Sequence, residues 1–189
     1  MSTRFDNRSV DTFKKDIKFG TMLEKYFFHQ WLEVATNRPL LILSWEDNGC
    51  GNDGEFIAKG NTAGADYKVN GVPLEIKWVP TAGKFTLKEN DLKAYIREGA
   101  DILFIYNTGS ANLRKPKDYD LDRHIELIED NASDIRWGIM QASQVRKLYD
   151  DAKENNLFKP IPYMGNKSGV VLKSKDFHKY FVEWEWTTK

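Results

Sequence analysis

The sequence predicts a single α/β domain over 1–189, with a mixed central sheet flanked by helices and a C-terminal α+β extension. Three observations lead to this prediction. Apolar residues recur at helical spacing over 17–35, residues 64–79 alternate about an Asn-Gly pair, and a capping pattern precedes a continuous apolar run at 101–107. The chain order is then helix, three strands, helix and strand, with a core at about 17–107 and an extension at about 108–189.

The first helix is predicted over 17–35, where Phe19, Leu23 and Phe27 share one face. The polar residues before it are expected to form an arm or a short separate helix. The sequence Asn-Arg-Pro at 37–39 ends the helix, and 40–45 is predicted as a buried strand. A long polar, glycine-rich connection follows at 46–62, with a short strand at 56–58, and we expect this connection to border a functional site.

A β-hairpin is predicted around Asn70-Gly71, because both residues accept the positive φ that a two-residue turn requires. In this register Val69 faces Val72, and apolar residues fill one face of the pair. On the other face Asp66 is predicted to lie opposite Glu75, with Lys77 on the same side.

The facing carboxylates are the unusual feature of this hairpin. Residues opposite each other in an antiparallel pair lie about 5 Å apart, where like charges destabilise the pair. At an effective dielectric constant near 20 the repulsion is about 3 kcal/mol. Two acids and an ammonium group in one place therefore predict a site for a hard divalent ion such as Mg²⁺.

The second half of the core is predicted as a parallel crossover. Residues 86–89, Thr-Leu-Lys-Glu, read as a capping box that opens a helix, with Leu92 and Tyr95 on its inner face and Gly99 as its C-terminal stop. The apolar run at 101–107 is expected in the middle of the sheet, parallel to the strand before the helix.

The extension adds several elements to this core. A strand is predicted at 135–140, a helix capped by Ser143 follows it, and 182–186 alternates as edge strands do. Trp184 and Trp186 fall on one side of that strand, where core or interface packing is the more common role of tryptophan.

Asp66, eight intervening residues and Glu75-Ile76-Lys77 resemble the motif of the PD-(D/E)XK nuclease superfamily. The predicted element order also resembles the restriction-endonuclease-like αβββαβ core of that family. Ala65 stands where the family name has proline. The resemblance covers roughly 17–107. Within the superfamily, the chain resembles the resolvase, Mrr-like and phage nucleases.

The resemblance implies a Mg²⁺-dependent DNA endonuclease, in which Mn²⁺ can substitute. Asp66, Glu75 and the backbone carbonyl of Ile76 would hold the metal, and Lys77 would orient or activate the attacking water. Gly20 and Glu24 match a helix pattern of archaeal Holliday-junction resolvases and Mrr-like enzymes, which implies that Glu24 completes the metal coordination.

DNA is the expected partner. With 28 basic and 28 acidic residues the chain carries no net charge, which argues against a globally basic binding surface and leaves a local one. Compact size favours a homodimer that cuts both strands. The residues expected to contact the DNA backbone are Lys84, Lys88, Lys93, Arg114, Lys115 and Lys117.

Cys50 is the sole cysteine, and no apolar run in the sequence is long enough to cross a membrane. We therefore expect a protein that does not enter membranes and works in the cytoplasm, which is the host cytoplasm if a phage encodes it. Restriction, homing, recombination and degradation all stay open as roles.

Three other interpretations of the sequence remain open. Asp47 or Asp53 can serve as the first acid of a motif that ends in Asp66-Tyr67-Lys68. The chain can have a nuclease fold that binds nucleic acid or a partner without cutting. It can also be a metal-independent interaction module that uses its tryptophan-rich C-terminal segment.

Overall fold

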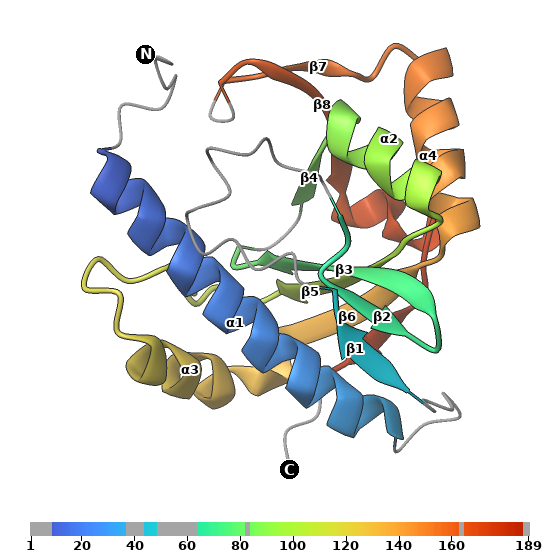
Figure 1. Ribbon diagram of the computed structural model, residues 1–189. Coiled ribbons are helices and arrows are strands. Elements are labelled where there is room, and N and C mark those ends of the chain that lie inside the picture. Colours follow the sequence, from blue (N-terminus) through green and yellow to red (C-terminus); the bar gives the residue numbers. More distant parts are fainter. Residues whose placement is uncertain (1–8, 37–43, 49–63, 82–83, 163–164, 187–189) are drawn as a thin grey trace.

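The computed structural model describes residues 9–36, 44–48, 64–81, 84–162 and 165–186 (Figure 1). In chain order its helices and strands are α1 (Val10–Thr36), β1 (Trp45–Asp47), β2 (Tyr67–Val69), β3 (Val72–Val79), β4 (Lys84–Lys88), α2 (Glu89–Glu98), β5 (Asp101–Asn107), α3 (Leu121–Asp130), η2 (Ala132–Asp134), β6 (Ile135–Met140), α4 (Ala142–Glu154), β7 (Lys159–Ile161), β8 (Lys167–Lys173), η4 (Ser174–Lys179) and β9 (Glu183–Glu185).

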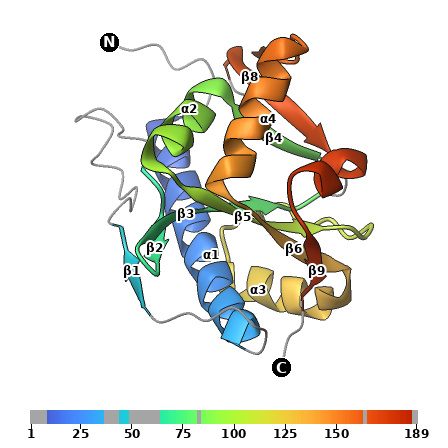
Figure 2. The same ribbon diagram turned by 90° about the vertical axis from the view of Figure 1, so that its right-hand side faces the viewer.

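The strands form two sheets. The larger sheet has the order β1-β2-β3-β5-β6-β9, in which β3 and β5 are parallel and the other neighbours antiparallel. The smaller sheet has the order β4-β8-β7. Helices α1 and α3 cover one face of the larger sheet, and α2 and α4 lie on the other (Figures 1 and 2). The predicted α/β class, with a mixed sheet flanked by helices, is confirmed.

Helix α1 starts earlier than predicted, at Val10 rather than near residue 17. The side chain of Ser9 caps it, since Ser9 Oγ accepts a hydrogen bond of 3.1 Å from the backbone nitrogen of Thr12. The predicted inner face is confirmed, because Phe19, Leu23 and Phe27 are all buried against the sheet. No helix in the described part of the chain combines the length and the apolarity needed to cross a membrane.

The hairpin has the predicted turn and the predicted register. Asn70 and Gly71 have φ values of 51° and 79°, and Val69 pairs with Val72. The ladder ends earlier than predicted, however, at the pair of Tyr67 with Leu74. Asp66 therefore lies at a bend just before β2 and is not a strand partner of Glu75.

Strand β1 differs from the buried strand predicted at 40–45. Residues 40–43 and the strand predicted at 56–58 lie outside the described residues. The described strand begins at Trp45, continues to Asp47 and is exposed throughout, because it forms the edge of the larger sheet.

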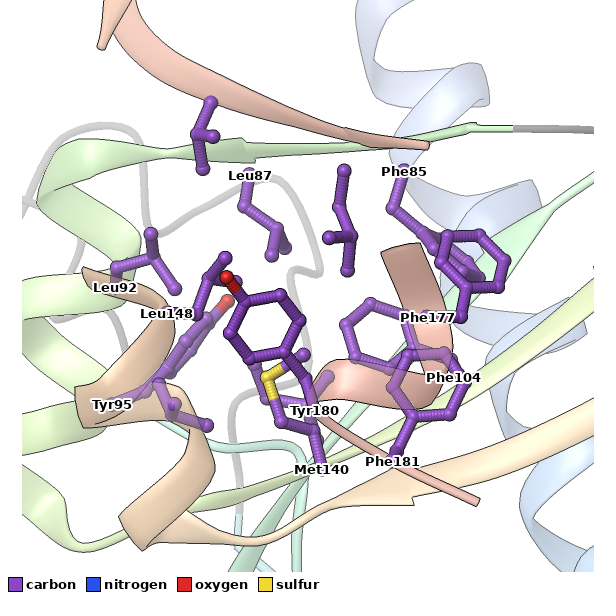
Figure 3. Packing of buried hydrophobic residues seen from close by; sticks show 14 of the residues in the cluster. Phe85, Leu87, Leu92, Tyr95, Phe104, Met140, Leu148, Phe177, Tyr180 and Phe181 are labelled. Atoms are coloured by element: carbon purple, nitrogen blue, oxygen red, sulfur yellow. The ribbon is translucent and has the colours of Figure 1, made fainter. Parts of the chain in front are cut away.

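The capping box predicted at 86–89 is wrong. Thr86 lies within β4 and pairs with Val171 of β8, and α2 begins only at Glu89 without a side-chain cap. The reason is packing: Phe85 and Leu87 alternate into the buried cluster between the smaller sheet, α2 and α4 (Figure 3). The predicted stop of this helix is confirmed, since Gly99 adopts the left-handed conformation with φ 66°.

The extension completes both sheets. Strand β6 pairs with β5 as an antiparallel neighbour, and β9 forms the far edge, so both predicted strands are confirmed. Trp184 stacks on Trp137 with ring centroids 4.6 Å apart, and Trp186 is buried. The cap predicted at Ser143 is wrong, because Asp101 Oδ1 instead accepts a 2.8 Å hydrogen bond from the Ala142 nitrogen at the start of α4.

Candidate active site

Three acids, a lysine and a tyrosine meet at the hairpin. Glu75 and Lys77 come from β3, Asp66 from the bend before β2, Glu24 from α1 and Tyr95 from α2. Their charges act on one another: the pKa of Glu24 responds to Asp66, Glu75 and Lys77. The structure thus brings together the four side chains that the sequence predicted as catalytic.

Strand geometry places Glu75 and Lys77 on the same side of β3, since they are two residues apart. Glu75 is 6% exposed, although it is a carboxylate in the middle of a sheet. Its Oε1 forms an ion pair with Lys77 Nζ. Burial lowers the pKa of Lys77, but the negative charges of Glu75 and Asp66 outweigh this effect and hold the pKa well above its usual range.

Asp66 reaches Glu75 by a route other than the predicted strand pairing. Its Oδ2 accepts a 2.8 Å hydrogen bond from the backbone nitrogen of Ile76, in the middle of β3. This bond turns the carboxylate toward β3, where it is in hydrogen-bonding contact with the side chain of Glu75. Burial and the charge of Glu75 together raise the pKa of Asp66 to about 7, against the opposing effects of Lys77 and the Ile76 nitrogen.

Glu24 comes from the middle of α1, one residue after the buried Leu23. Burial, followed by the charge of Asp66, raises its pKa to about 8, and Lys77 opposes this rise. Two of the three acids therefore hold their protons more firmly than ordinary carboxyl groups do. The cause in each case is desolvation together with a neighbouring carboxylate.

Tyr95 is a member of the cluster that the sequence reasoning missed as a site residue. Its hydroxyl donates a 2.7 Å hydrogen bond to Glu75 Oε1 from the inner face of α2. The helical spacing predicted that Tyr95 faces inward, but which strand residue it meets depends on how α2 packs on the sheet. Burial also raises the pKa of the Tyr95 hydroxyl, which therefore stays a donor.

A cavity of about 680 Å³ opens beside Lys77. Lys84, Lys88 and Arg114 line it together with Lys77, so four cations surround the space. Asp91 is the one acid among the lining residues that the structure describes, and its Oδ2 pairs with Lys88 Nζ at 3.1 Å. Positive charge is thus concentrated next to the acid cluster in a chain with no net charge.

Lys93, Lys115 and Lys117, the other residues predicted to bind DNA, do not line this cavity. Arg114 also lines a second cavity, of about 730 Å³, with Lys115 and Lys117. Acids share that lining, and Lys115 forms an ion pair with Asp16. Lys93 stands apart from both cavities: it pairs with Glu89 at 2.6 Å on α2.

The donor set of the cluster has the chemistry of a Mg²⁺ site, because carboxylate oxygens are the ligands that hard divalent ions prefer. The contact of Asp66 with Glu75, and the charge interaction of both with Glu24, bring these oxygens into one place. As the side chains stand, with Lys77 paired to Glu75, no three acid, histidine or cysteine side chains of the described residues form a ready ligand group. The residues fit the ion by the chemistry of their oxygen donors.

The rival motif Asp66-Tyr67-Lys68 is not assembled in the same way. Tyr67 is buried and stacks on Phe28 with ring centroids 3.6 Å apart, and Lys68 Nζ pairs with Glu46 Oε1 at 3.1 Å near the sheet edge. Asp47 lies on β1, opposite Tyr67, and Asp53 lies outside the described residues.

Comparison of this chain with protein-family models, with characterised proteins and with solved structures found no match in any of the three. We therefore infer the function from the residues and their geometry.

Proposed function

We propose that this chain is a metal-dependent DNA endonuclease of the PD-(D/E)XK type. The observation that carries the proposal is the meeting of Asp66, Glu75 and Lys77 beside a cavity lined with cations. The order α1, β1, β2, β3, α2, β5 also supports it, since β1 to β3 form an antiparallel meander and β5 returns parallel to β3. The additional strand β4 leaves this order to join the smaller sheet.

Asp66, Glu75 and the backbone carbonyl of Ile76 would hold Mg²⁺, with Glu24 completing the outer coordination and Mn²⁺ as a substitute. The bound ion supplies a water of lowered pKa and offsets negative charge on the scissile phosphate. Carboxylates bind such an ion in their deprotonated form. The raised pKa values of Asp66 and Glu24 therefore connect metal affinity to pH.

The chain's own residues supply the remaining chemistry. Lys77 keeps its charge at all physiological pH values and can stabilise the additional negative charge that the phosphate gains in the transition state. Tyr95 holds one oxygen of Glu75 in place by donating its hydroxyl proton. A fixed carboxylate keeps the reacting groups in the geometry that the reaction needs.

The cavity beside Lys77 is the proposed path of the DNA backbone. Lys84, Lys88 and Arg114 would contact phosphates there, and Lys115 and Lys117 would extend the contacts along the second cavity. Lys93 is less suited to this role, because it lies outside both linings and is paired with Glu89.

We also propose that the enzyme works as a homodimer, since a two-fold arrangement of one active site per chain cuts both strands of a duplex. Such an enzyme acts where DNA is accessible, in the cytoplasm of the cell, or of the host if a phage encodes it.

The test is cleavage of supercoiled plasmid in Mg²⁺, with branched and single-stranded DNA as further substrates. We expect the wild-type protein to nick at least one of them and both Asp66→Ala and Lys77→Ala to abolish nicking. Lys68→Ala is the matched control, because it removes a lysine of the neighbouring strand that belongs to the rival motif. Loss of cleavage in Lys68→Ala with retention in Lys77→Ala would transfer the site to that motif.

A second candidate is a nuclease-like protein that binds DNA without cutting it. The ion pair of Lys77 with Glu75, together with the lack of a ready ligand group among the described residues, favours this candidate. Binding to DNA without cleavage of any of the three substrates, in Mg²⁺ or in Mn²⁺, would establish it over the nuclease.

A further inference from the structure

The smaller sheet presents five lysines on one face. Strand pairing puts Lys84 opposite Lys173, and places Lys88 and Lys159 on either side of Gly169. Lys167 lies two residues before Gly169 and therefore points to the same side. We call this set, Lys84, Lys88, Lys159, Lys167 and Lys173, the lysine face.

The opposite face of this sheet is accounted for by packing. Phe85 and Leu87 of β4 and Val170 and Leu172 of β8 are buried in the cluster that α2 and α4 complete (Figure 3). The helices cover that side of the sheet (Figure 1). The helices lie on the opposite side from the lysine face, where Lys84, Lys159, Lys167 and Lys173 are exposed and Ile161 is buried beside Gly169.

Four of the five lysines of the lysine face form no ion pair with a carboxylate of the described residues. Like charges directly opposite each other destabilise an antiparallel pair, and Lys84 faces Lys173 in this way. None of the three strands contains an acid. Lys88 pairs with Asp91, whereas no carboxylate of the described residues pairs with Lys84, Lys159, Lys167 or Lys173. An anionic partner would offset this repulsion.

The size and position of the lysine face indicate the kind of partner. Lys167 and Lys173 are six residues apart along β8, and the three strands span two strand spacings, so the area measures about 20 Å by about 10 Å. A single small anion cannot contact lysines spread over such an area, but a polyanion can. Lys84 and Lys88 also line the cavity beside Lys77, so the lysine face continues the cation-lined path from the acid cluster.

We infer that the lysine face is an accessory binding surface for the phosphate backbone of duplex DNA, which holds the DNA beyond the cut bond. The inference rests on the proposed function for the identity of the polyanion. It assigns a role to β7 and β8, which lie outside the αβββαβ order. We expect these lysines to contact phosphates, which carry no sequence information, so the surface would add affinity without sequence preference.

The test compares two triple variants by fluorescence anisotropy with a labelled duplex of about three helical turns, in EDTA. The sheet variant is Lys159→Gln/Lys167→Gln/Lys173→Gln. The matched control is Arg146→Gln/Lys147→Gln/Lys153→Gln, which removes the same charge from α4 on the other side of the sheet. Urea unfolding of both variants checks that the fold is intact.

We expect the sheet variant to bind at least about tenfold more weakly than the control, with similar losses for all duplex sequences. If each lysine neutralises one phosphate, the slope of log K against log salt concentration falls in magnitude by about 2.7. The variant Lys159→Arg/Lys167→Arg/Lys173→Arg should restore binding. Equal affinities of the sheet variant and the control, or no binding of duplex by the wild-type protein, would overturn the inference.

Vesicle binding and DNA cleavage are two further measurements, and they show whether the inference or the proposed function has failed. Anionic phosphatidylserine vesicles that bind through the same lysines, while duplex does not, would assign the lysine face to a membrane surface and overturn the DNA inference. A wild-type protein that binds duplex through these lysines but nicks no DNA refutes the nuclease and leaves the inference standing. Cleavage that is accompanied by equal binding of the sheet variant and the control refutes the inference only.

Discussion

The hydroxyl of Tyr95 donates a 2.7 Å hydrogen bond to Glu75 Oε1 and thereby ties α2 to the centre of the acid cluster. The same oxygen pairs with Lys77 Nζ, so one carboxylate oxygen receives both an ammonium and a phenol. These two contacts fix the position of the Glu75 carboxylate on β3. The helix that crosses between β3 and β5 is therefore part of the site as well as part of the fold.

Replacing Tyr95 with phenylalanine tests this relationship. The ring and its packing remain, but Glu75 loses a donor in a buried position. Hydrogen bonds to charged groups contribute about 1.5–3 kcal/mol, so we expect the free energy of unfolding to fall by this order. The cleavage rate should fall at least about tenfold with little change in KM, because the carboxylate is less well oriented.

The control for this variant is Tyr180→Phe, which removes a hydrogen bond from a tyrosine hydroxyl to a carboxylate elsewhere in the fold. Tyr180 Oη lies 2.9 Å from Asp151 Oδ2, away from the acid cluster. We expect Tyr180→Phe to lose stability and to keep its cleavage rate. Equal rates for Tyr95→Phe and the wild-type protein would remove Tyr95 from the site.

The stability of the metal-free protein should depend on pH through Glu24 and Asp66. Folding raises their pKa values to about 8 and about 7, so the folded state binds more protons than the unfolded state at neutral pH. The free energy of unfolding is therefore expected to be highest below about pH 4 with respect to these groups and to fall as the pH rises to about 8. Urea unfolding in EDTA at several pH values measures this slope.

Glu24→Gln is the variant that checks the assignment of this slope. Glutamine is neutral at every pH, so the variant should lose part of the decline between about pH 5 and pH 8 and should be more stable than the wild-type protein at pH 8. Glu33→Gln removes a carboxylate from an exposed position of the same helix and is the control for the loss of that charge. A steeper decline in Glu24→Gln than in the wild-type protein would contradict the assignment.

Metal binding should release protons, because Asp66 and Glu24 are partly protonated at neutral pH and a metal takes the deprotonated carboxylate. The rise in melting temperature caused by Mn²⁺ or Mg²⁺ is therefore expected to be larger at pH 8.5 than at pH 6. Calorimetry in two buffers with different ionisation enthalpies counts the released protons. Glu75→Gln should reduce the rise at both pH values, whereas a rise that is unchanged in Glu75→Gln would exclude this acid as a ligand.

Local sequence signals were sufficient for the hairpin and for the inner face of α1. The turn at Asn70-Gly71 depends on the φ values of two residues, and the register of Val69 with Val72 follows from it. The same register placed Glu75 and Lys77 on one side of β3. The convergence of Asp66 on Glu75 was also anticipated, although the ladder stops at Tyr67 and a side-chain bond to the Ile76 nitrogen replaces the strand pairing.

The features that could not be predicted from the sequence depend on contacts with residues far away in the chain. Residues 86–89 have the local pattern of a helix start, but β8 pairs with Thr86, Leu87 and Lys88 from more than eighty positions later, so that only Glu89 belongs to α2. The contact of Tyr95 with Glu75 likewise depends on where α2 lands after the crossover. The lysine face exists only once β4, β7 and β8 have paired, since its members are dispersed over 84–173.

The smaller sheet itself can be tested by its two faces. Leu87 is 2% exposed and packs into the cluster below the sheet, whereas Val171 is 41% exposed on the lysine face. We expect Leu87→Ala to lower the free energy of unfolding by about 2–5 kcal/mol, since it leaves a cavity among packed side chains. Val171→Ala, on the neighbouring strand, should cost less than about 0.5 kcal/mol, as surface substitutions usually do. Urea unfolding measures both, and similar losses for the two variants would mean that Leu87 and Val171 do not lie on a buried and an exposed face of the smaller sheet.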